Sequence, residues 1–321
     1  MSASPRLPAA ARAIRQGDRR ALARAITAVE NDDPSAGPVV RALYPLTGHV
    51  PLVGLTGPLG VGKSSLLSGL IALLRAQGKS VAAIAVDPSS PFSGGSVLGD
   101  RIRLERRADD DGVFFRSMAS RGEAGGVAAS TREVARLLEA AGFDIVFVET
   151  VGSGQVDVAI REIATTSVVV LVPHLGDEVQ TLKAGLFEIA DVFDVNKSDL
   201  PGAEIAARDL TELATLGAPR DGWRPRIVRT STTTPAGLPE LWDAVMAHEQ
   251  FLDASGAREA GERRRLAAEI AGRLSSRVGR DVRRRLEADA ELRTLLDRVV
   301  ARQVDPASAA DRLYRDHFRA R

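Results

Sequence analysis

The stretch "GPLGVGKSS" at residues 57–65 constrains this chain more than any other segment. It follows the apolar run "PLVGLT" and precedes "LLSGLIALLRAQG", so it joins a predicted strand to a predicted helix. Gly57, Gly62, Lys63 and Ser64 fit the pattern G-x-x-x-x-G-K-[ST]. In this pattern backbone N–H groups surround phosphates, the lysine reaches the β- and γ-phosphates, and the hydroxyl binds Mg²⁺. The predicted phosphate-contacting residues are Gly57, Gly60, Val61, Gly62, Lys63, Ser64 and Ser65.

Short apolar runs alternate with helical stretches from residue 49 to residue 250. The runs are "PLVGLT", "VAAIAV", "DIVFVE", "SVVVLV", "VFDVN" and "RIVRT", and the helical stretches include 64–77, 131–141, 178–190 and 237–248. Because the runs lack polar alternation, they predict strands that are covered on both faces, as in a parallel sheet. The alternation predicts an α/β fold, a three-layer P-loop NTPase domain with a mostly parallel sheet, whose ligands gather at the carboxyl ends of the strands.

Helical patterns flank this domain on both sides. Residues 1–48 predict an N-terminal helical extension, in which Asp18 is an N-cap and four apolar residues share one helical face: Leu22, Ala25, Ile26 and Val29. Residues 251–321 predict a C-terminal helical region with a stripe formed by Leu266, Ile270, Leu274, Val278, Val282 and Leu286. Such a stripe needs a partner surface, which is either the sheet domain or a second subunit; in the second case residues 251–321 are a dimerisation region.

Composition excludes several classes of protein. The chain has 321 residues, a net charge of +1 and no cysteine, which excludes disulfides, Cys-ligated zinc and iron–sulfur clusters. Runs of arginine at 263–265 and 283–285 are interspersed with acidic residues and lack aromatic neighbours, so they indicate solvated helix faces and no nucleic-acid partner. No apolar run approaches the ~20 residues of a membrane span. We therefore expect a soluble, cytoplasmic protein with no membrane partner.

Acidic residues end two of the predicted strands after the phosphate loop. Asp87 ends one strand and Glu149 ends another, with Gly152 and Gln155 following in "ETVGSGQ". P-loop NTPases use such acidic residues to hold Mg²⁺ directly or through water. We expect Gly152 to point a backbone N–H at the γ-phosphate and Gln155 to orient the attacking water, so that hydrolysis frees the loop.

The segment "VNKSD" predicts which base is bound. Asn196, Lys197 and Asp199 form N-K-x-D after an apolar run. The aspartate can accept from both N1–H and the N2 amine of guanine, whereas adenine would leave the carboxylate unpaired, which gives strong discrimination. We therefore predict GTP and GDP as ligands, with Mg²⁺. The other side of the base pocket is expected from backbone N–H groups near Ser231, Thr232 and Thr233 in "RTSTTTPAG".

Four longer strings resemble one family: "VDPSSPFSGGSVLGDRIR", "FRSMASRG", "GFDIVFVETVGSGQ" and "LKAGLFEIADVFDVNKSD". They are similar to the methylmalonyl-CoA mutase-associated GTPases, the MeaB/ArgK/MMAA family, over nearly the whole chain. The resemblance implies a homodimeric GTPase chaperone for an adenosylcobalamin-dependent acyl-CoA mutase. It would gate cofactor loading and protect or reactivate the mutase. A cobalamin adenosyltransferase is a further candidate partner.

The resemblance also implies roles for particular residues. Asp87, Asp100 and Glu149 match positions around Mg²⁺ and the switch loops. The segment 172–183 matches a further switch, and its predicted polar contacts with the mutase are Asp177, Glu178 and Lys183. Apart from the resemblance, Arg101, Arg103 and Arg121 lie in segments that we expect to be mobile loops, so each is a candidate catalytic arginine, and we count Arg103 among the predicted catalytic residues.

Two switch segments depart from the family pattern. The chain has "VGSGQVD" where the family often reads "VGVGQSE", and "PHLGDE" where "PGAGDE" is common. The departures leave GTP binding intact and leave the partner open. The candidates are mutases acting on methylmalonyl-, isobutyryl-, ethylmalonyl- or hydroxyisobutyryl-CoA.

Three other functions remain as alternatives. A nickel-delivery GTPase would need histidine runs or cysteine pairs, but the four histidines are scattered. A small-molecule kinase would need an acceptor pocket with a base and a lid, and no such constellation is visible in the sequence. A non-hydrolysing binding module is harder to separate, because intrinsic switch GTPases turn over on the order of 10⁻⁴ to 10⁻² s⁻¹ without help.

Overall fold

The protein divides into two compact units, Met1–Glu269 and Ile270–Arg321. The computed structural model describes residues 7–88, 110–120, 124–150, 156–173, 187–234 and 236–319. The predicted N-terminal extension and sheet domain both lie within the first unit. The first part of the predicted C-terminal region, residues 251–269, belongs to the same unit.

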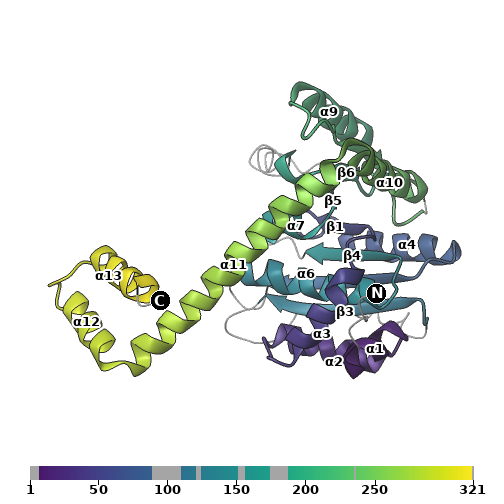
Figure 1. The fold of residues 1–321 in the computed structure, drawn as a ribbon. Coiled ribbons are helices and arrows are strands. Elements are labelled where there is room, and N and C mark those ends of the chain that lie inside the picture. The colour runs from purple at the N-terminus through teal and green to yellow at the C-terminus, as the bar shows by residue number, and fades with distance from the viewer. Residues whose placement is uncertain are drawn as a thin grey trace. The chain divides into compact units, whose positions relative to one another are not determined.

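A seven-stranded parallel sheet forms the centre of the first unit, in the order β3-β2-β4-β1-β5-β6-β7 (Figure 1). The strands are β1 (Leu52–Thr56), β2 (Val81–Pro88), β3 (Val113–Ser120), β4 (Ile145–Thr150), β5 (Thr166–Leu171), β6 (Val192–Val195) and β7 (Arg226–Arg229). All six ladders between neighbours are parallel. The fold predicted from the alternating runs is confirmed, and β1 lies where the strand order reverses, which is where such sheets bind ligands.

Strand β3 was not predicted as a strand. Its sequence "VFFRSMAS" places Arg116 and Ser117 inside the run, which weakens the apolar signal. The strand lies at the edge of the sheet, where polar side chains are tolerated. Arg116 forms an ion pair with Glu30 of the N-terminal helices and donates to Thr27 Oγ1 at 3.1 Å. The arginine thus anchors the N-terminal extension to the edge strand.

Helices cover both faces of the sheet. α4 (Lys63–Ala76) and α10 (Leu238–Ser255) pack on one face, where they bury β-strand residues such as Val53, Leu55 and Phe147. α6 (Ala124–Ala140), α7 (Val156–Ile163) and α9 (Ala203–Leu216) cover the other face, over Val146 and Val148. Neighbouring residues of β4 alternate between the two cores, as the strand period of two requires. Each fully buried aliphatic or aromatic side chain contributes about 1.5–3 kcal/mol, so the sheet is a rigid platform for its loops.

The N-terminal helices pack against α6 beside β3 (Figure 1). They are α1 (Ala9–Arg15), α2 (Arg19–Glu30) and α3 (Ala36–Leu43), followed by a 3₁₀ turn, η1 (Tyr44–Leu46). The predicted N-cap is confirmed, because Asp18 Oδ1 accepts from the N–H groups of Arg20 and Ala21 at 2.9 Å each. The predicted apolar face of α2 is buried.

The C-terminal segment is helical, as the sequence predicted. Its helices are α11 (Ala257–Ala288), which crosses from the first unit into the second, α12 (Ala290–Val300) and α13 (Pro306–Arg319). Within the second unit Leu292, Leu295 and Ala309 are buried, whereas Ile270 and Leu274 are 67% and 55% exposed. The role of this region in dimerisation stays a prediction.

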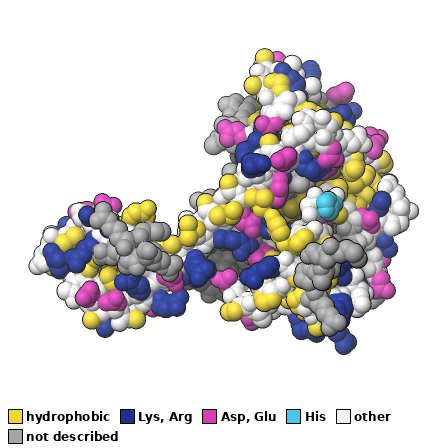
Figure 2. Space-filling view, viewed as in Figure 1, with side chains coloured by type: hydrophobic (Ala, Val, Ile, Leu, Met, Phe, Trp, Pro, Cys, Tyr) yellow, Lys and Arg dark blue, Asp and Glu magenta, His cyan; other side chains and the backbone are white. Residues whose placement is uncertain are grey.

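The surface carries both signs of charge. On the face seen in Figure 2, Lys and Arg side chains are interspersed with Asp and Glu and with hydrophobic side chains. This matches the small net charge of +1. None of the helices in the described ranges is long and apolar enough to cross a membrane.

Candidate functional site: the carboxyl edge of the sheet

The phosphate loop connects β1 to α4 and needs glycine at particular points. Gly57 has φ +137°, and a Cβ built there would lie 2.2 Å from the backbone oxygen of Val170 in β5. Gly62 has φ +95° at the start of α4, and its Cβ would lie 2.6 Å from Asn196 Nδ2. Both positions combine a left-handed backbone with no room for a side chain. The loop is therefore held close against β5 and against the residues that follow β6.

Lys63 opens α4 with its ammonium group turned back toward the loop. The residue is only 6% exposed, and Nζ donates to the carbonyl oxygens of Gly57 at 2.7 Å and Pro58 at 2.8 Å. A phosphate chain lying in the loop would offer this cation charged acceptors, which form stronger hydrogen bonds than neutral carbonyls do. The lysine is thus positioned for the role predicted from the sequence.

Ser64 and Glu149 meet where the sequence placed a metal. The Ser64 hydroxyl donates to Glu149 Oε1 at 2.5 Å, although the two residues are 85 positions apart. They come together because β4, which carries the nearly buried Glu149, lies next to β1. A hydroxyl and a carboxylate are the hard oxygen ligands that Mg²⁺ prefers. These two residues fit a Mg²⁺ ion, which would offset phosphate charge when bound.

Asn196 and Lys197 tie the base motif to the phosphate loop. Asn196 Nδ2 donates to the backbone oxygen of Val61 at 2.8 Å, and Lys197 Nζ donates to that of Gly60 at 2.9 Å. Lys197 has φ +56°, a left-handed conformation that is uncommon for a residue with a side chain. Such backbone persists where the surrounding contacts determine it, and it is typical of functional sites. The two motifs, 135 residues apart in sequence, form one structural unit.

Asp199 and Ser231 form the opposite part of the predicted base pocket. The Ser231 hydroxyl donates to Asp199 Oδ1 at 2.6 Å and lies 2.8 Å from Thr233 Oγ1. The hydrogen bond from Ser231 holds the pKa of Asp199 below its ordinary value. The carboxylate is exposed and charged, as recognition of two N–H donors of guanine requires. Thr232 is exposed on the same loop.

Asp194 and Thr230 form a buried layer that sequence reasoning missed. Asp194 is 0% exposed and its two carboxyl oxygens lie 2.8 and 2.9 Å from Thr230 Oγ1. The same hydroxyl lies 3.2 Å from Asn196 Oδ1, so the pair orients the asparagine that holds the phosphate loop. Burial raises the pKa of Asp194 to about 7. The available signal was an acidic residue inside the otherwise apolar strand "VFDV".

Several predicted site residues lie outside the described residues. For Asp87 the structure describes the backbone in β2 and not the side chain. The others, whose predicted roles stay predictions, are Asp100, Arg101, Arg103, Arg121, Gly152, Gln155, Asp177, Glu178 and Lys183. Val61 is buried in the phosphate loop, and Ser65 is half-buried in the first turn of α4.

Comparison with known families gives one match over most of the chain. The profile of the family described as "Methylmalonyl Co-A mutase-associated GTPase MeaB" matches residues 22–287. A Pyrococcus abyssi protein, provisionally named a GTPase, is 46% identical over 310 residues, covering 94% of each chain. GTPase ArgK of Escherichia coli is 38% identical over 253 residues, covering 76% of each chain. The mitochondrial methylmalonic aciduria type A homolog of Mus musculus is 35% identical and covers 75% of this chain and 62% of its own.

One solved structure matches over nearly the full length. It is described as a crystal structure of an LAO/AO transport system kinase, and it superimposes with a TM-score of 0.70. The two sequences are 29% identical, and the match covers 95% of each chain. The similarity therefore extends from the sheet to the flanking helices.

Proposed function

Because the chain belongs to the methylmalonyl-CoA mutase-associated GTPase family, we propose that its GTPase cycle serves a B12-dependent acyl-CoA mutase. The protein would gate adenosylcobalamin loading and protect or reactivate that mutase. One observation carries the nucleotide part of this proposal: Asn196 and Lys197 hold the carbonyl groups of the phosphate loop. The guanine-binding motif and the phosphate-binding loop are therefore close enough for one nucleotide to contact both.

The residues divide the work of binding GTP between them. Asp199 accepts from guanine, and the aliphatic part of Lys197 covers the base plane. Lys63 exchanges the carbonyls of Gly57 and Pro58 for the phosphates. Ser64 and Glu149 hold Mg²⁺, whose charge favours the transition state of phosphoryl transfer. Asp87 and Asp100 complete the surroundings of the ion.

We assign hydrolysis and its communication to a partner to the segments that follow β2, β4 and β5. Gln155 orients the attacking water and Arg103 neutralises developing charge, while Gly152 senses the γ-phosphate. The segment 172–183 then passes the nucleotide state to the mutase through Asp177, Glu178 and Lys183. Homodimerisation through the C-terminal helices is supported by exposed apolar residues in the second unit: Ile270, Leu274, Leu296, Val300 and Tyr314.

The proposal is tested by GTP turnover with and without partners. The purified protein is assayed for phosphate release from GTP alone and with each of several purified adenosylcobalamin-dependent acyl-CoA mutases. We expect slow turnover alone and a rise of at least about tenfold with one mutase, since partner groups accelerate switch GTPases by more than this. Lys63→Ala is the control that should remove turnover in both conditions.

Two outcomes would overturn the proposal. Unchanged turnover with every mutase, together with no co-elution, would reject the partner while leaving the GTPase assignment in place. Transfer of the γ-phosphate to a metabolite at rates exceeding GTP hydrolysis would favour a kinase, the activity named for the solved neighbour.

A further inference from the structure

A cavity lies at the amino edge of the sheet, opposite the carboxyl edge that carries the candidate nucleotide site. It has a volume of about 350 Å³, and its walls include Arg161, Arg220, Asp221, Trp223, His248 and Arg264. Asp191, which also lines it, directly precedes β6, whereas the base motif begins at Asn196 directly after β6. The cavity is therefore separated from the nucleotide residues by the length of that strand. The nucleotide site makes no use of it.

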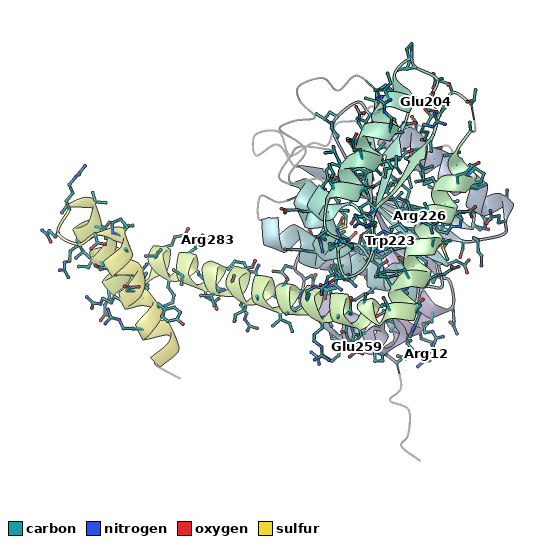
Figure 3. The ribbon with its side chains drawn as sticks, turned by 90° about the horizontal axis from the view of Figure 1, so that it is seen from above. Arg12, Glu204, Trp223, Arg226, Glu259 and Arg283 are labelled. Carbon is teal, nitrogen blue, oxygen red and sulfur yellow. The ribbon has the colours of Figure 1, made fainter. Side chains whose placement is uncertain are left out.

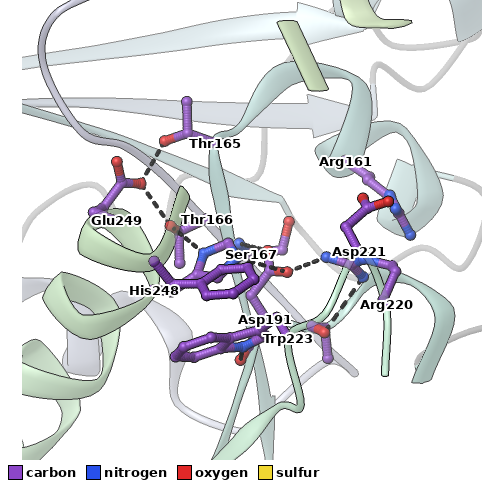
Figure 4. A network of polar contacts seen from close by, with 12 residues as sticks. Arg161, Thr165, Thr166, Ser167, Asp191, Arg220, Asp221, Trp223, His248 and Glu249 are labelled. Carbon is purple, nitrogen blue, oxygen red and sulfur yellow. Dashed lines mark hydrogen bonds and ion pairs between the residues drawn. The ribbon is translucent and has the colours of Figure 1, made fainter. Parts of the chain in front are cut away.

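Five arginines line this cavity, and three of them come from separate segments of the chain: Arg161, Arg220 and Arg264. Arg220 forms an ion pair with Asp191, and Arg264 of α11 pairs with Asp221 at 2.7 Å. Arg161, at the end of α7, lies beside Arg220 and Asp221 (Figure 4) and donates to the backbone oxygen of Glu188. Among the described residues no carboxylate forms an ion pair with Arg161. Burial, and then the charge of Arg220, lower the pKa of Arg161, and the carboxylates of Asp191 and Asp221 offset part of this effect.

Aromatic rings form a fixed wall opposite the arginines. The Trp223 ring lies 4.9 Å from the His248 ring and 5.2 Å from the Phe251 ring, measured between centroids. Trp223 Nε1 donates to the backbone oxygen of Asp191 at 2.9 Å. The Arg226 guanidinium carbon lies over the indole, 5.5 Å from the ring centroid, and both residues are labelled in Figure 3. The indole is thus held by contacts on several sides. A preformed wall of this kind lowers the entropic cost of binding a ligand.

The polar network behind the wall contributes no positive charge of its own. His248 Nδ1 lies 2.8 Å from Thr166 Oγ1 and Nε2 lies 3.4 Å from Asp191 Oδ1. Burial lowers the pKa of His248 to about 4, so the ring is neutral near pH 7. Glu249 is compensated separately, by Arg258 at 2.9 Å. Five arginines and three acidic residues, Glu162, Asp191 and Asp221, line the cavity, so the excess charge on its walls is positive.

We propose that this cavity binds a small organic anion, with Arg161 and Arg264 holding its oxyanion group and Trp223 and Phe251 covering its apolar part. A guanidinium presents paired N–H donors that match a carboxylate or a phosphate. The volume lies within the range of about 300–1,000 Å³ that is usual for small-molecule sites. A cationic end and an aromatic wall together select a ligand that is charged at one end and apolar at the other.

The experiment uses Trp223 as the reporter. The chain contains two tryptophans, so Trp242→Phe leaves Trp223 as the sole emitter. Saturating GDP and Mg²⁺ are added first, because phosphate would otherwise also occupy the phosphate loop. Benzoate, acetate and inorganic phosphate are then titrated at constant ionic strength. We expect a saturable fluorescence change, with benzoate binding more tightly than acetate; the phosphate arm shows which oxyanion is preferred.

Arginine variants, each combined with Trp242→Phe, test whether Arg161 and Arg264 bind the anion. Arg161→Gln and Arg264→Gln should each weaken the tightest anion by about tenfold or more, as loss of a hydrogen bond to a charged group implies. Arg208→Gln removes an exposed arginine of α9 and should change nothing. Melting temperatures of all variants are recorded. The Arg264 side chain is 57% exposed, so we expect Arg264→Gln to fold. This variant therefore tests the site even if Arg161→Gln fails to fold. No saturable response to any anion, or equal affinity in the folded arginine variants, overturns the proposal.

Discussion

Replacing Gly57 by alanine should damage the nucleotide site more than the loss of one glycine would suggest. The residue is the first glycine of the phosphate loop, directly after β1. Its φ of +137° is one that residues with side chains rarely adopt. Its Cβ would also lie 2.2 Å from the backbone oxygen of Val170, and backbone cannot rotate away as a flexible side chain can.

The magnitude follows from comparing two glycines. Gly78, after α4, has φ +78° and a Cβ there would meet nothing within 4 Å, so Gly78→Ala carries conformational strain alone. That strain costs about 1–2 kcal/mol. Gly57→Ala adds the displacement of the loop or of β5, and we expect a total loss of about 3–5 kcal/mol in the free energy of unfolding. If the loop moves instead of the strand, the cost appears as lost affinity for GTP.

The assay measures both quantities for both variants. Urea unfolding followed by tryptophan fluorescence reports the stability of the first unit, and titration with a fluorescent GTP analogue reports affinity. We expect Gly57→Ala to lose at least about 3 kcal/mol summed over the two measurements, and Gly78→Ala to keep its affinity. Wild-type stability and affinity in Gly57→Ala would refute the close packing of this loop against β5.

Three further predictions concern the metal, a buried acid and a buried ion pair. Ser64→Ala should weaken the Mg²⁺ dependence of GTP binding, since it removes the hydroxyl that faces Glu149, and a Mg²⁺ titration measures this. Asp194 has a pKa of about 7 in the folded protein and an ordinary value of 3.8. Between these values the folded state binds one more proton than the unfolded state, so the stability of the wild type should fall as pH rises. The loss would be up to about 4 kcal/mol, and Asp194→Asn should flatten it in urea unfolding at pH 4 to 8. Glu269→Gln should lower the free energy of unfolding by about 3 kcal/mol because it leaves Arg136, whose side chain is only 14% exposed, without its carboxylate, whereas a loss below about 1 kcal/mol would contradict that interpretation.

The candidate site could be predicted from the sequence because its motifs occupy fixed places relative to strands. Gly57, Glu149 and Asn196 each lie at or just beyond the carboxyl end of a strand, and a parallel sheet brings such ends to one edge. The convergence of Ser64 with Glu149 was therefore predictable from the order of motifs. The hydrogen bonds from Asn196 and Lys197 to the phosphate loop were not, because they depend on side-chain directions.

Strand β3, the role of Asp194 and the cavity at the amino edge were not predicted, because each depends on contacts between distant parts of the chain. Strand β3 lies at the edge of the sheet and carries Arg116 to bind α2, so its sequence lacks the apolar signature of a buried strand. Asp194 is a buried acid in a short strand, and its role is visible only when Thr230 lies beside it. The cavity at the amino edge is lined by Arg161, Arg220 and Arg264, which come from three segments of the chain that no local pattern connects.

The most direct test of the guanine-nucleotide site is the nucleotide selectivity of the wild type and of Asp199→Asn. Calorimetric titration with GTP, ATP and xanthosine triphosphate, each with Mg²⁺, gives the affinities. We expect the wild type to bind GTP at least about 100-fold more tightly than ATP, because ATP leaves the Asp199 carboxylate unpaired. Asp199→Asn should lose affinity for GTP and gain it for xanthosine triphosphate, which carries an oxygen in place of the guanine amine. Equal binding of GTP and ATP by the wild type, or an Asp199→Asn variant with unchanged preference, would contradict the assignment of this edge as a guanine-nucleotide site.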